Sequence, residues 1–259
     1  MSSFLLPKTV IKQIDKYRKH CLWRGSDISS KKPSKAAWPL VCLPKPEGGL
    51  GVLNLTVQNE SLLLKHLHKF YNRAPIPWVQ LVWTKYYSRH RLPVGGVTFR
   101  GSFWWRDILK LIDQFKGIAM VSVRDGKSCF LWHDLWDGTI CSQAFPELFS
   151  FAKNQYISVS LAATDTPFHV QFHLPLPPEA YAQYLQLNDM VQSIQFQHDS
   201  DVWTYIWRSS AFSSRKAYKQ LIGHRHIHQS FFWLWKSSCQ NKRKKIANPT
   251  GQIKYKSSP

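Results

Sequence analysis

Lysines at a regular spacing near the N-terminus give the clearest chemical signal in this sequence. Lys8, Lys12, Lys16 and Lys19 recur every three or four residues, a spacing that places side chains on one face of a helix. A row of ammonium groups arranged in this way can follow a phosphate backbone. An ordinary solvent-facing helix shows the same row, so the spacing alone leaves both interpretations open.

Histidines form two further patterns that could do chemistry. His133 and Asp134 are neighbours, which could suggest acid–base work, but tryptophans on both sides favour a packed aromatic turn. The histidines in the run GHRHIH, residues 223–228, alternate and could hold a divalent metal if a strand put them on one face. No acidic residue or cysteine nearby completes a ligand set. We therefore favour a polar loop and expect no metal, no cofactor and no catalytic residue.

The distribution of charge points to a polyanionic partner. The formal net charge is +20. Residues 1–100 hold 17 Lys/Arg against 4 Asp/Glu, residues 101–200 hold 6 against 10, and residues 201–259 hold 12 against 1. Basic ends suit RNA or DNA bound without sequence preference, because contacts to phosphates release counterions. The alternative is a soluble basic protein whose lysines are only hydrated.

Composition also restricts the compartment and the class of partner. No apolar run reaches the roughly 18 residues of a membrane helix, so we expect no membrane partner. The five cysteines include no Cys-x-x-Cys pair, which is typical of a reducing compartment without a disulfide framework. The basic run at residues 242–245 could serve as a nuclear localisation patch, and we expect a nuclear or cytoplasmic protein with the nucleus favoured. No small-molecule substrate is expected.

The apolar period predicts which elements position the basic residues. A helix is predicted over residues 7–23, with Val10, Ile14, Tyr17 and Cys21 on its buried face. A polar loop follows at residues 26–37. Pro44 and Pro46 oppose a helix in the next segment, and the glycines after them allow a tight bend. A second helix is predicted over residues 56–72, with Leu63, Leu67 and Phe70 buried.

The remainder of the chain is predicted to be mainly helical with two small β-hairpins. The first hairpin joins residues 119–124 to 127–132 through Asp125-Gly126, a strong two-residue turn signal. The second is a strand, turn and strand within residues 202–212. An irregular connector is predicted at residues 154–177, and a disordered basic tail at 240–259. Helices are predicted at residues 78–87, 102–115, 146–153, 178–194, 213–222 and 230–239.

Several motifs, in order along residues 4 to 240, resemble one known family. They include HCLWRG at residues 20–25, WPLVCLPKPEGGLGVLN at 38–54, GSFWW at 101–105, DGKS at 125–128 and LWHDLW at 131–136. Together they resemble the region downstream of the polymerase core in plant non-LTR (LINE-type) retrotransposon reverse transcriptases. The resemblance implies a helical, thumb-like basic region at residues 1–95 and a linker at 96–201. It further implies the start of a truncated zinc-binding domain at residues 202–239.

The resemblance also implies what this chain does not do. Phosphoryl transfer needs paired carboxylates that hold two cations, and no Asp-Asp pair with strand–turn–strand context occurs here. We therefore expect a chain without the catalytic palm, which is not an enzyme and keeps sequence-independent nucleic-acid binding. Two alternatives remain: an inert product of a decayed element, and a protein-interaction module with no nucleic-acid role.

Two sets of residues are predicted to carry these roles. The structural set surrounds the bend and consists of Trp38, Gly48, Gly49 and Gly51. The nucleic-acid-binding set consists of Lys8, Lys12, Lys16, Lys19, Arg24, Lys31, Lys32, Lys35, Lys65, Lys69, Arg73, Arg89 and Arg91.

Overall fold

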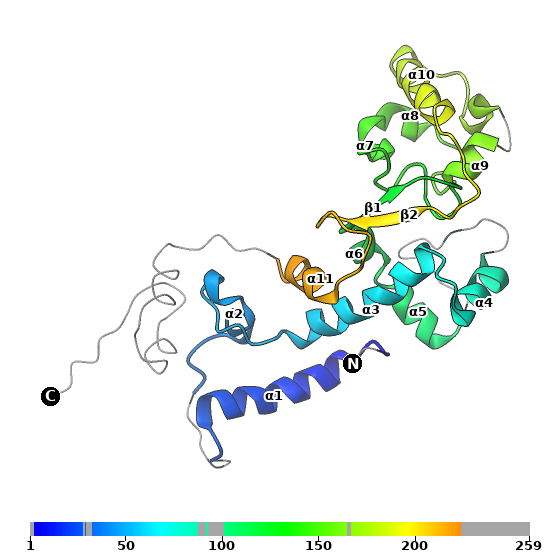
Figure 1. Cartoon of the computed structure of the whole chain (residues 1–259). Helices are drawn as coiled ribbons and strands as arrows, with labels where there is room; N and C mark the ends of the chain where they lie inside the picture. Colours follow the sequence, from blue (N-terminus) through cyan, green and yellow to red (C-terminus); the bar gives the residue numbers. More distant parts are fainter. Residues whose placement is uncertain are drawn as a thin grey trace. The chain divides into compact units, whose positions relative to one another are not determined.

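A computed structural model describes residues 3–27, 29, 33–87, 92, 101–164 and 167–223. The chain is mainly helical with one small two-stranded antiparallel sheet, which confirms the predicted class (Figure 1). It divides into two compact units, residues 1–62 with 217–259 and residues 63–216. The division falls inside helix α3, Leu55–Tyr71. Each unit is described separately below.

The first unit is built around helix α1, Lys8–Arg24, which Gly25 follows. With it lie α2 (Trp38–Cys42), the 3-10 helix η1 (Lys45–Glu47), the start of α3 and most of α11 (Ser214–Leu221). The predicted helices at 7–23 and 56–72 agree with α1 and α3 to within one residue. Helix α2 was not predicted. It forms because Pro39 lies in its first turn, where a missing N–H costs no helical hydrogen bond.

The bend between α2 and α3 depends on close backbone approach. Gly48 ends η1 in the left-handed conformation, with φ 81°, which glycine adopts without strain. A Cβ added to Gly49 would lie 2.0 Å from the carbonyl oxygen of Leu43. The Gly51 N–H donates to that same oxygen at 2.9 Å. The bend therefore leaves no room for a side chain at residue 49.

Aromatic rings form much of the core of the second unit. Helices α4 (Pro77–Tyr86), α5 (Phe103–Leu109) and α6 (Ile112–Lys116) contribute to it together with the end of α3. Phe70 stacks on Trp83 at 4.8 Å between ring centroids, and Tyr71 stacks on Phe115 at 5.2 Å. Leu63, Leu67 and Phe70 are fully buried, as predicted.

The helix predicted over residues 102–115 is present as two shorter helices. Ser102 caps α5 by accepting a hydrogen bond from the Trp105 N–H at 3.3 Å, as the sequence predicts. The helix then ends at Leu109, and Leu111, with φ −97° and ψ 7°, precedes α6. The break leaves both Leu111 and Ile112 buried.

The predicted hairpins are wrong for the residues that the structure describes. Strand β1, Ala119–Ser122, pairs antiparallel with β2, Val202–Tyr205, with Ala119 opposite Tyr205. Residues 127–132 contain no strand, and residues 206–212 contain only an isolated bridge to Tyr205. Each strand thus finds its partner more than 75 residues away, which a local turn signal cannot reveal.

A buried carboxylate shapes the loop that follows β1. Asp201, 1% exposed, accepts hydrogen bonds from the N–H groups of Arg124 (2.7 Å), Gly126 (2.8 Å) and Ser128 (2.9 Å). It also accepts from the Ser128 hydroxyl at 2.9 Å. Three backbone donors in and beside the Asp125-Gly126 turn are therefore satisfied by one side chain. This explains why Asp125-Gly126 forms a turn without a hairpin.

The rest of the second unit is a group of short helices packed around α10, Pro178–Gln192 (Figure 1). It comprises α7 (Cys141–Ala144), α8 (Pro146–Ser150), α9 (Val159–Thr164) and the 3-10 helix η2 (Phe168–Gln171). The predicted helix starts at Pro146 and Pro178 are confirmed. The connector predicted to be irregular at residues 154–177 contains α9 and η2. The predicted helix at 230–239 and the predicted tail at 240–259 lie outside the described residues.

A hydrogen-bonded chain surrounds His68 in the second unit. The Asn72 side-chain oxygen accepts from the Trp203 N–H at 3.0 Å, so its NH₂ group faces His68 Nδ1 at 3.1 Å. The same NH₂ group donates to the His68 carbonyl at 2.9 Å. The Tyr205 hydroxyl lies 2.7 Å from His68 Nδ1. Burial, with a smaller contribution from Lys69, lowers the pKa of His68.

This arrangement predicts that the fold loses stability in mild acid. The unfolded chain takes up a proton on His68 near pH 6.5, the usual value, whereas the folded chain resists it, so the free energy of unfolding falls as pH drops below that point. Urea unfolding at pH 5 and pH 7.5 measures the difference. In His68→Gln we expect a smaller difference between the free energies of unfolding at the two pH values. The difference should stay above zero because burial also lowers the pKa of His133. If the variant and the natural chain showed the same difference in free energy of unfolding between the two pH values, the proposed role of His68 would be contradicted.

Candidate nucleic-acid interface

Polar contacts anchor helix α1 within the first unit. The Leu6 N–H donates to the Asn59 side-chain oxygen at 2.7 Å, and the Asn59 NH₂ group donates to the Phe4 carbonyl at 2.9 Å. In the middle of the helix, Arg18 pairs with Asp15 at 2.7 Å and donates to the Leu53 carbonyl at 2.7 Å. Its guanidinium also lies 5.2 Å from the ring centroid of Trp38. Arg18 is therefore a structural cation.

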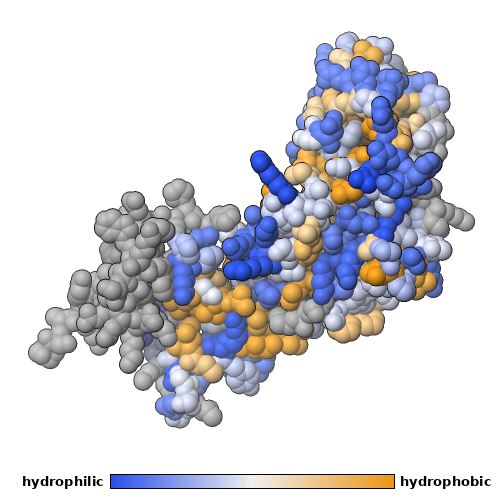
Figure 2. Space-filling model, in the orientation of Figure 1, coloured by the Kyte–Doolittle hydropathy of each residue, from blue (hydrophilic) through white to orange (hydrophobic). Residues whose placement is uncertain are grey.

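The apolar face of α1 does not lie where the period predicts. Ile11 is the only fully buried residue of α1, whereas Val10 is 43%, Ile14 39% and Tyr17 63% exposed. Cys21 is exposed as well. The predicted buried face is thus wrong, because the helix packs through the side that carries Ile11, Asp15 and Arg18. Figure 2 shows hydrophobic and hydrophilic residues side by side over the part of the surface around α1 and α2.

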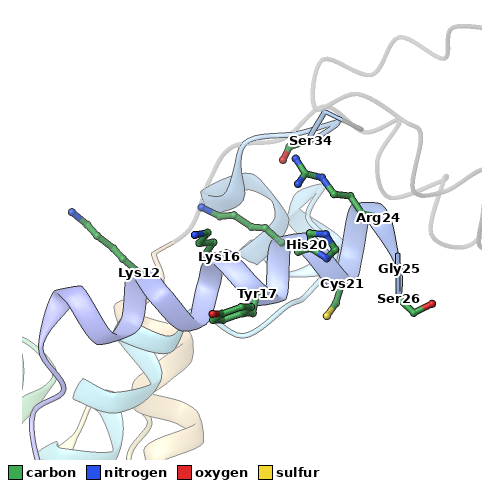
Figure 3. A pocket seen from close by; sticks show the side chains of 10 residues that line it. Lys12, Lys16, Tyr17, His20, Cys21, Arg24, Gly25, Ser26 and Ser34 are labelled. Atoms are coloured by element: carbon green, nitrogen blue, oxygen red, sulfur yellow. The ribbon is translucent and has the colours of Figure 1, made fainter. Parts of the chain in front are cut away.

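A hollow of about 760 Å³ lies along α1 and gathers several of the predicted contact residues (Figure 3). The side chains of Lys12 and Arg24 extend to one side of the helix, and those of Tyr17 and Cys21 lie on the other. Among the described residues, its lining consists of Lys12, Lys16, Tyr17, Lys19, His20, Cys21, Arg24, Gly25, Ser26 and Ser34. We call this feature the basic hollow.

The electrostatic character of the basic hollow is strongly positive. No aspartate or glutamate is among its described lining residues. None of the ion pairs between described residues involves Lys12 or Lys16. Both lysines are exposed, and Lys19 lies 5.6 Å from the ring centroid of Trp38. Such a surface attracts a polyanion and can bind phosphates.

The other predicted contact residues are dispersed. Lys8 and Lys35 are exposed in the first unit but do not line the basic hollow. Lys65 and Lys69 are half-buried on the part of α3 that belongs to the second unit. The remaining residues of the set, Lys31, Lys32, Arg89 and Arg91, lie outside the described residues.

Arg73 has a structural position that argues against its predicted role in binding. Its guanidinium pairs with the buried carboxylate of Asp125 at 2.7 Å. It also lies over the Trp83 ring, 4.5 Å from the centroid. With its side chain 25% exposed and its charge paired, Arg73 joins α3 to the loop after β1. The helical pattern placed this residue on a wet face because it cannot show a partner 52 positions away.

The neighbours His133 and Asp134 belong to the interior of the second unit. Asp134 is 1% exposed, pairs with Lys116 at 2.5 Å and accepts from the Phe130 N–H at 2.7 Å. The His133 ring packs on Tyr156, 4.9 Å between centroids. These contacts agree with the packed aromatic turn that the sequence favours. Lys116 and Asp134 form a structural ion pair.

Two other kinds of site are absent from the part of the chain that the structure describes. Within the described ranges, no group of three or more His, Cys, Asp or Glu residues could hold a metal ion. The alternating histidines at 224–228 lie outside these ranges. None of the described helices has the length and apolar content needed to cross a membrane.

Six residues of the basic hollow were missing from the predicted set: Tyr17, His20, Cys21, Gly25, Ser26 and Ser34. His20 could have been found, since it lies four positions from Lys16 along one helix, whereas Tyr17 lies three or four positions from none of the predicted cations. The position of Ser34 in the hollow could not have been predicted, because it depends on the path of the chain after Gly25.

Comparison with known proteins gives two plant relatives. No family model matches the chain, and no solved structure matches it. An Arabidopsis thaliana protein named for ribonuclease H is 31% identical over 144 residues, which are 52% of this chain and 22% of that protein. An uncharacterized mitochondrial protein of the same plant is 26% identical over 137 residues, 52% of this chain and 88% of its own length.

These relatives support a retroelement-related chain of plant type, in agreement with the coarser part of the resemblance. The chain spans about a fifth of the length of the first relative. The activity and partners of any longer protein are therefore matters for proposal.

Proposed function

We propose that this chain is a LINE-type retrotransposon segment that binds RNA or DNA without sequence preference through α1. The basic hollow carries the proposal, because it gathers Lys12, Lys16, Lys19 and Arg24 on one helix. The contacts of Arg18, and those of Asn59 on α3, hold α1 and the cations that it carries in place. Because α1 is already ordered, phosphate binding does not have to offset a loss of conformational entropy in the helix.

The proposed mode is contact with the nucleic-acid backbone. Lysine is a compact point charge on a flexible stem, and it suits phosphates of any sequence. Contacts of this kind fix position without reading bases. We propose RNA and DNA as the ligands, and neither a membrane nor a small-molecule substrate as a partner.

We further propose that the chain is a non-catalytic part of a reverse transcriptase, with a thumb-like segment to residue 95, a linker to 201 and a truncated zinc-binding segment to 239. Its proposed location is nuclear or cytoplasmic, with the nucleus favoured. Mg²⁺, nucleotides and a primed template should accordingly give no primer extension; template-directed synthesis would contradict this part of the proposal.

The salt dependence of binding tests the proposed function. We expect the purified chain to bind two oligonucleotides of unrelated sequence with equal affinity. For both, the logarithm of the association constant should fall linearly with the logarithm of salt concentration. Fluorescence anisotropy between 50 and 200 mM salt measures this. Absence of binding at low salt, or affinity that salt does not change, would refute the proposal.

One observation favours a second function, a protein-interaction module. Val10, Ile14 and Tyr17 give α1 an exposed apolar strip, and their spacing of four and three residues is that of a helix–helix seam. A chain that associates with a protein but shows no salt-dependent nucleic-acid binding would favour this function.

A further inference from the structure

Tyr17 gives the basic hollow a feature that charge alone does not explain. Its side chain is 63% exposed, more than any other tyrosine that the structure describes as exposed. It lines the same hollow as Lys16 and His20. Among the aromatic contacts of the described residues, no ring packs against Tyr17. The ring therefore offers a face to a ligand.

Two other rings of the described residues that are not fully buried have partners. Tyr181 on α10 stacks on Tyr184 at 6.0 Å between centroids, and Trp38 on α2 lies beneath the cation of Arg18. Tyr17 differs because no aromatic contact between described residues involves its ring, and the exposed Lys16, which precedes it on α1, lines the same hollow. A ring and a cation that line one hollow suit an unpaired nucleotide, since the base can stack while the phosphate is neutralised.

We propose that the basic hollow binds single-stranded nucleic acid, with one base stacked on Tyr17 and the adjoining phosphate held by Lys16. This inference rests on the proposed function and specifies its ligand. Base stacking on an aromatic side chain tolerates any sequence because every base has a π-face. The added contact thus agrees with binding that has no sequence preference.

The size of the hollow favours a single strand over a duplex. A volume of about 760 Å³ lies in the range of roughly 300–1,000 Å³ that encloses a drug-sized ligand. One or two nucleotides have that size, whereas a duplex keeps its bases stacked on each other and can present only its backbone. Ser26 and Ser34 also line the hollow, and their hydroxyls can donate to phosphate or sugar oxygens.

Three ligands of equal length separate the contribution of the bases from that of the phosphates. They are a 15-residue thymidine strand, an abasic strand with the same number of phosphates, and a 15-base-pair duplex. We expect the thymidine strand to bind about 5- to 100-fold more tightly than the abasic strand, the range that stacking of one base supplies. In Tyr17→Leu this preference should disappear, and in Tyr17→Phe it should remain.

Tyr181→Leu is the matched control, because it removes a tyrosine of similar exposure, 52%, from a different helix. It should keep the preference of the natural chain. Equal, salt-dependent binding of thymidine and abasic strands, or a preference that survives in Tyr17→Leu, would overturn the stacking inference and leave the proposed function intact. Failure to bind any of the three ligands at low salt would overturn both.

Discussion

Replacement of Lys12, Lys16 and Lys19 by glutamine is expected to weaken nucleic-acid binding about 10- to 100-fold at low salt. Each exposed charge contact contributes roughly 0.5–1 kcal/mol, and a tenfold change in affinity corresponds to about 1.4 kcal/mol. The three lysines line one hollow and are the main cations of the proposed interface. Because they are not fully buried, their removal should not unfold the chain. Fluorescence anisotropy with a labelled oligonucleotide measures the effect.

A second triple variant separates the position of these lysines from the total charge. Lys110, Lys153 and Lys216 are exposed and belong to the second unit. Their replacement by glutamine lowers the net charge of +20 by the same amount. We expect this control to keep nearly the affinity of the natural chain. Equal losses in the two variants would mean that the net charge attracts the ligand and that α1 has no special role.

Replacement of Asp201 by alanine is expected to destabilise the second unit by about 3–5 kcal/mol, because a buried donor left without its acceptor costs about 1–3 kcal/mol. Asp201 accepts four hydrogen bonds, three of them from backbone N–H groups of residues 124–128. Without the carboxylate, these donors lose their acceptor. Urea unfolding measures the loss, and amide hydrogen exchange at Gly126 and Ser128 should become faster.

Asp199 provides a control two positions away. Its side chain is 75% exposed and pairs with Arg124 at 3.4 Å, a surface pair of the kind that contributes at most about 1 kcal/mol. Asp199→Ala should therefore change the free energy of unfolding little. If Asp199→Ala and Asp201→Ala had the same small effect, the loop after β1 would not depend on the buried carboxylate.

Sequence reasoning succeeded where the cause of structure is local. The limits of α1 and α3, the cap at Ser102 and the start of α10 at Pro178 each depend on residues within one turn. It failed for the sheet, because the pairing of β1 with β2 and the bonds of Asp201 join residues more than 70 positions apart. The Asp125-Gly126 turn is real, but its donors are satisfied from a distance.

In the candidate site, too, features set by nearby residues were predictable and features set by distant residues were not. The lysine spacing identified Lys12, Lys16 and Lys19, which the structure brings to one hollow. The apolar period misplaced the buried side of α1, because polar anchors such as Arg18 and Asn59 hold the helix. Arg73 follows the same charge pattern as the lysines, although its partner, Asp125, lies in another segment. Charge in a sequence can indicate a binding surface, whereas the pairing of each charge depends on the fold.

The salt dependence of binding after loss of Lys12, Lys16 and Lys19 decides whether α1 holds the phosphates. The slope of the logarithm of affinity against the logarithm of salt concentration counts the phosphates that the protein neutralises, at about 0.7 per phosphate for single strands and 0.9 for duplex DNA. We predict a slope smaller in magnitude by about 2–3 in this variant, and an unchanged slope in the control with Lys110, Lys153 and Lys216 replaced. A slope equal to that of the natural chain in the α1 variant would contradict this prediction.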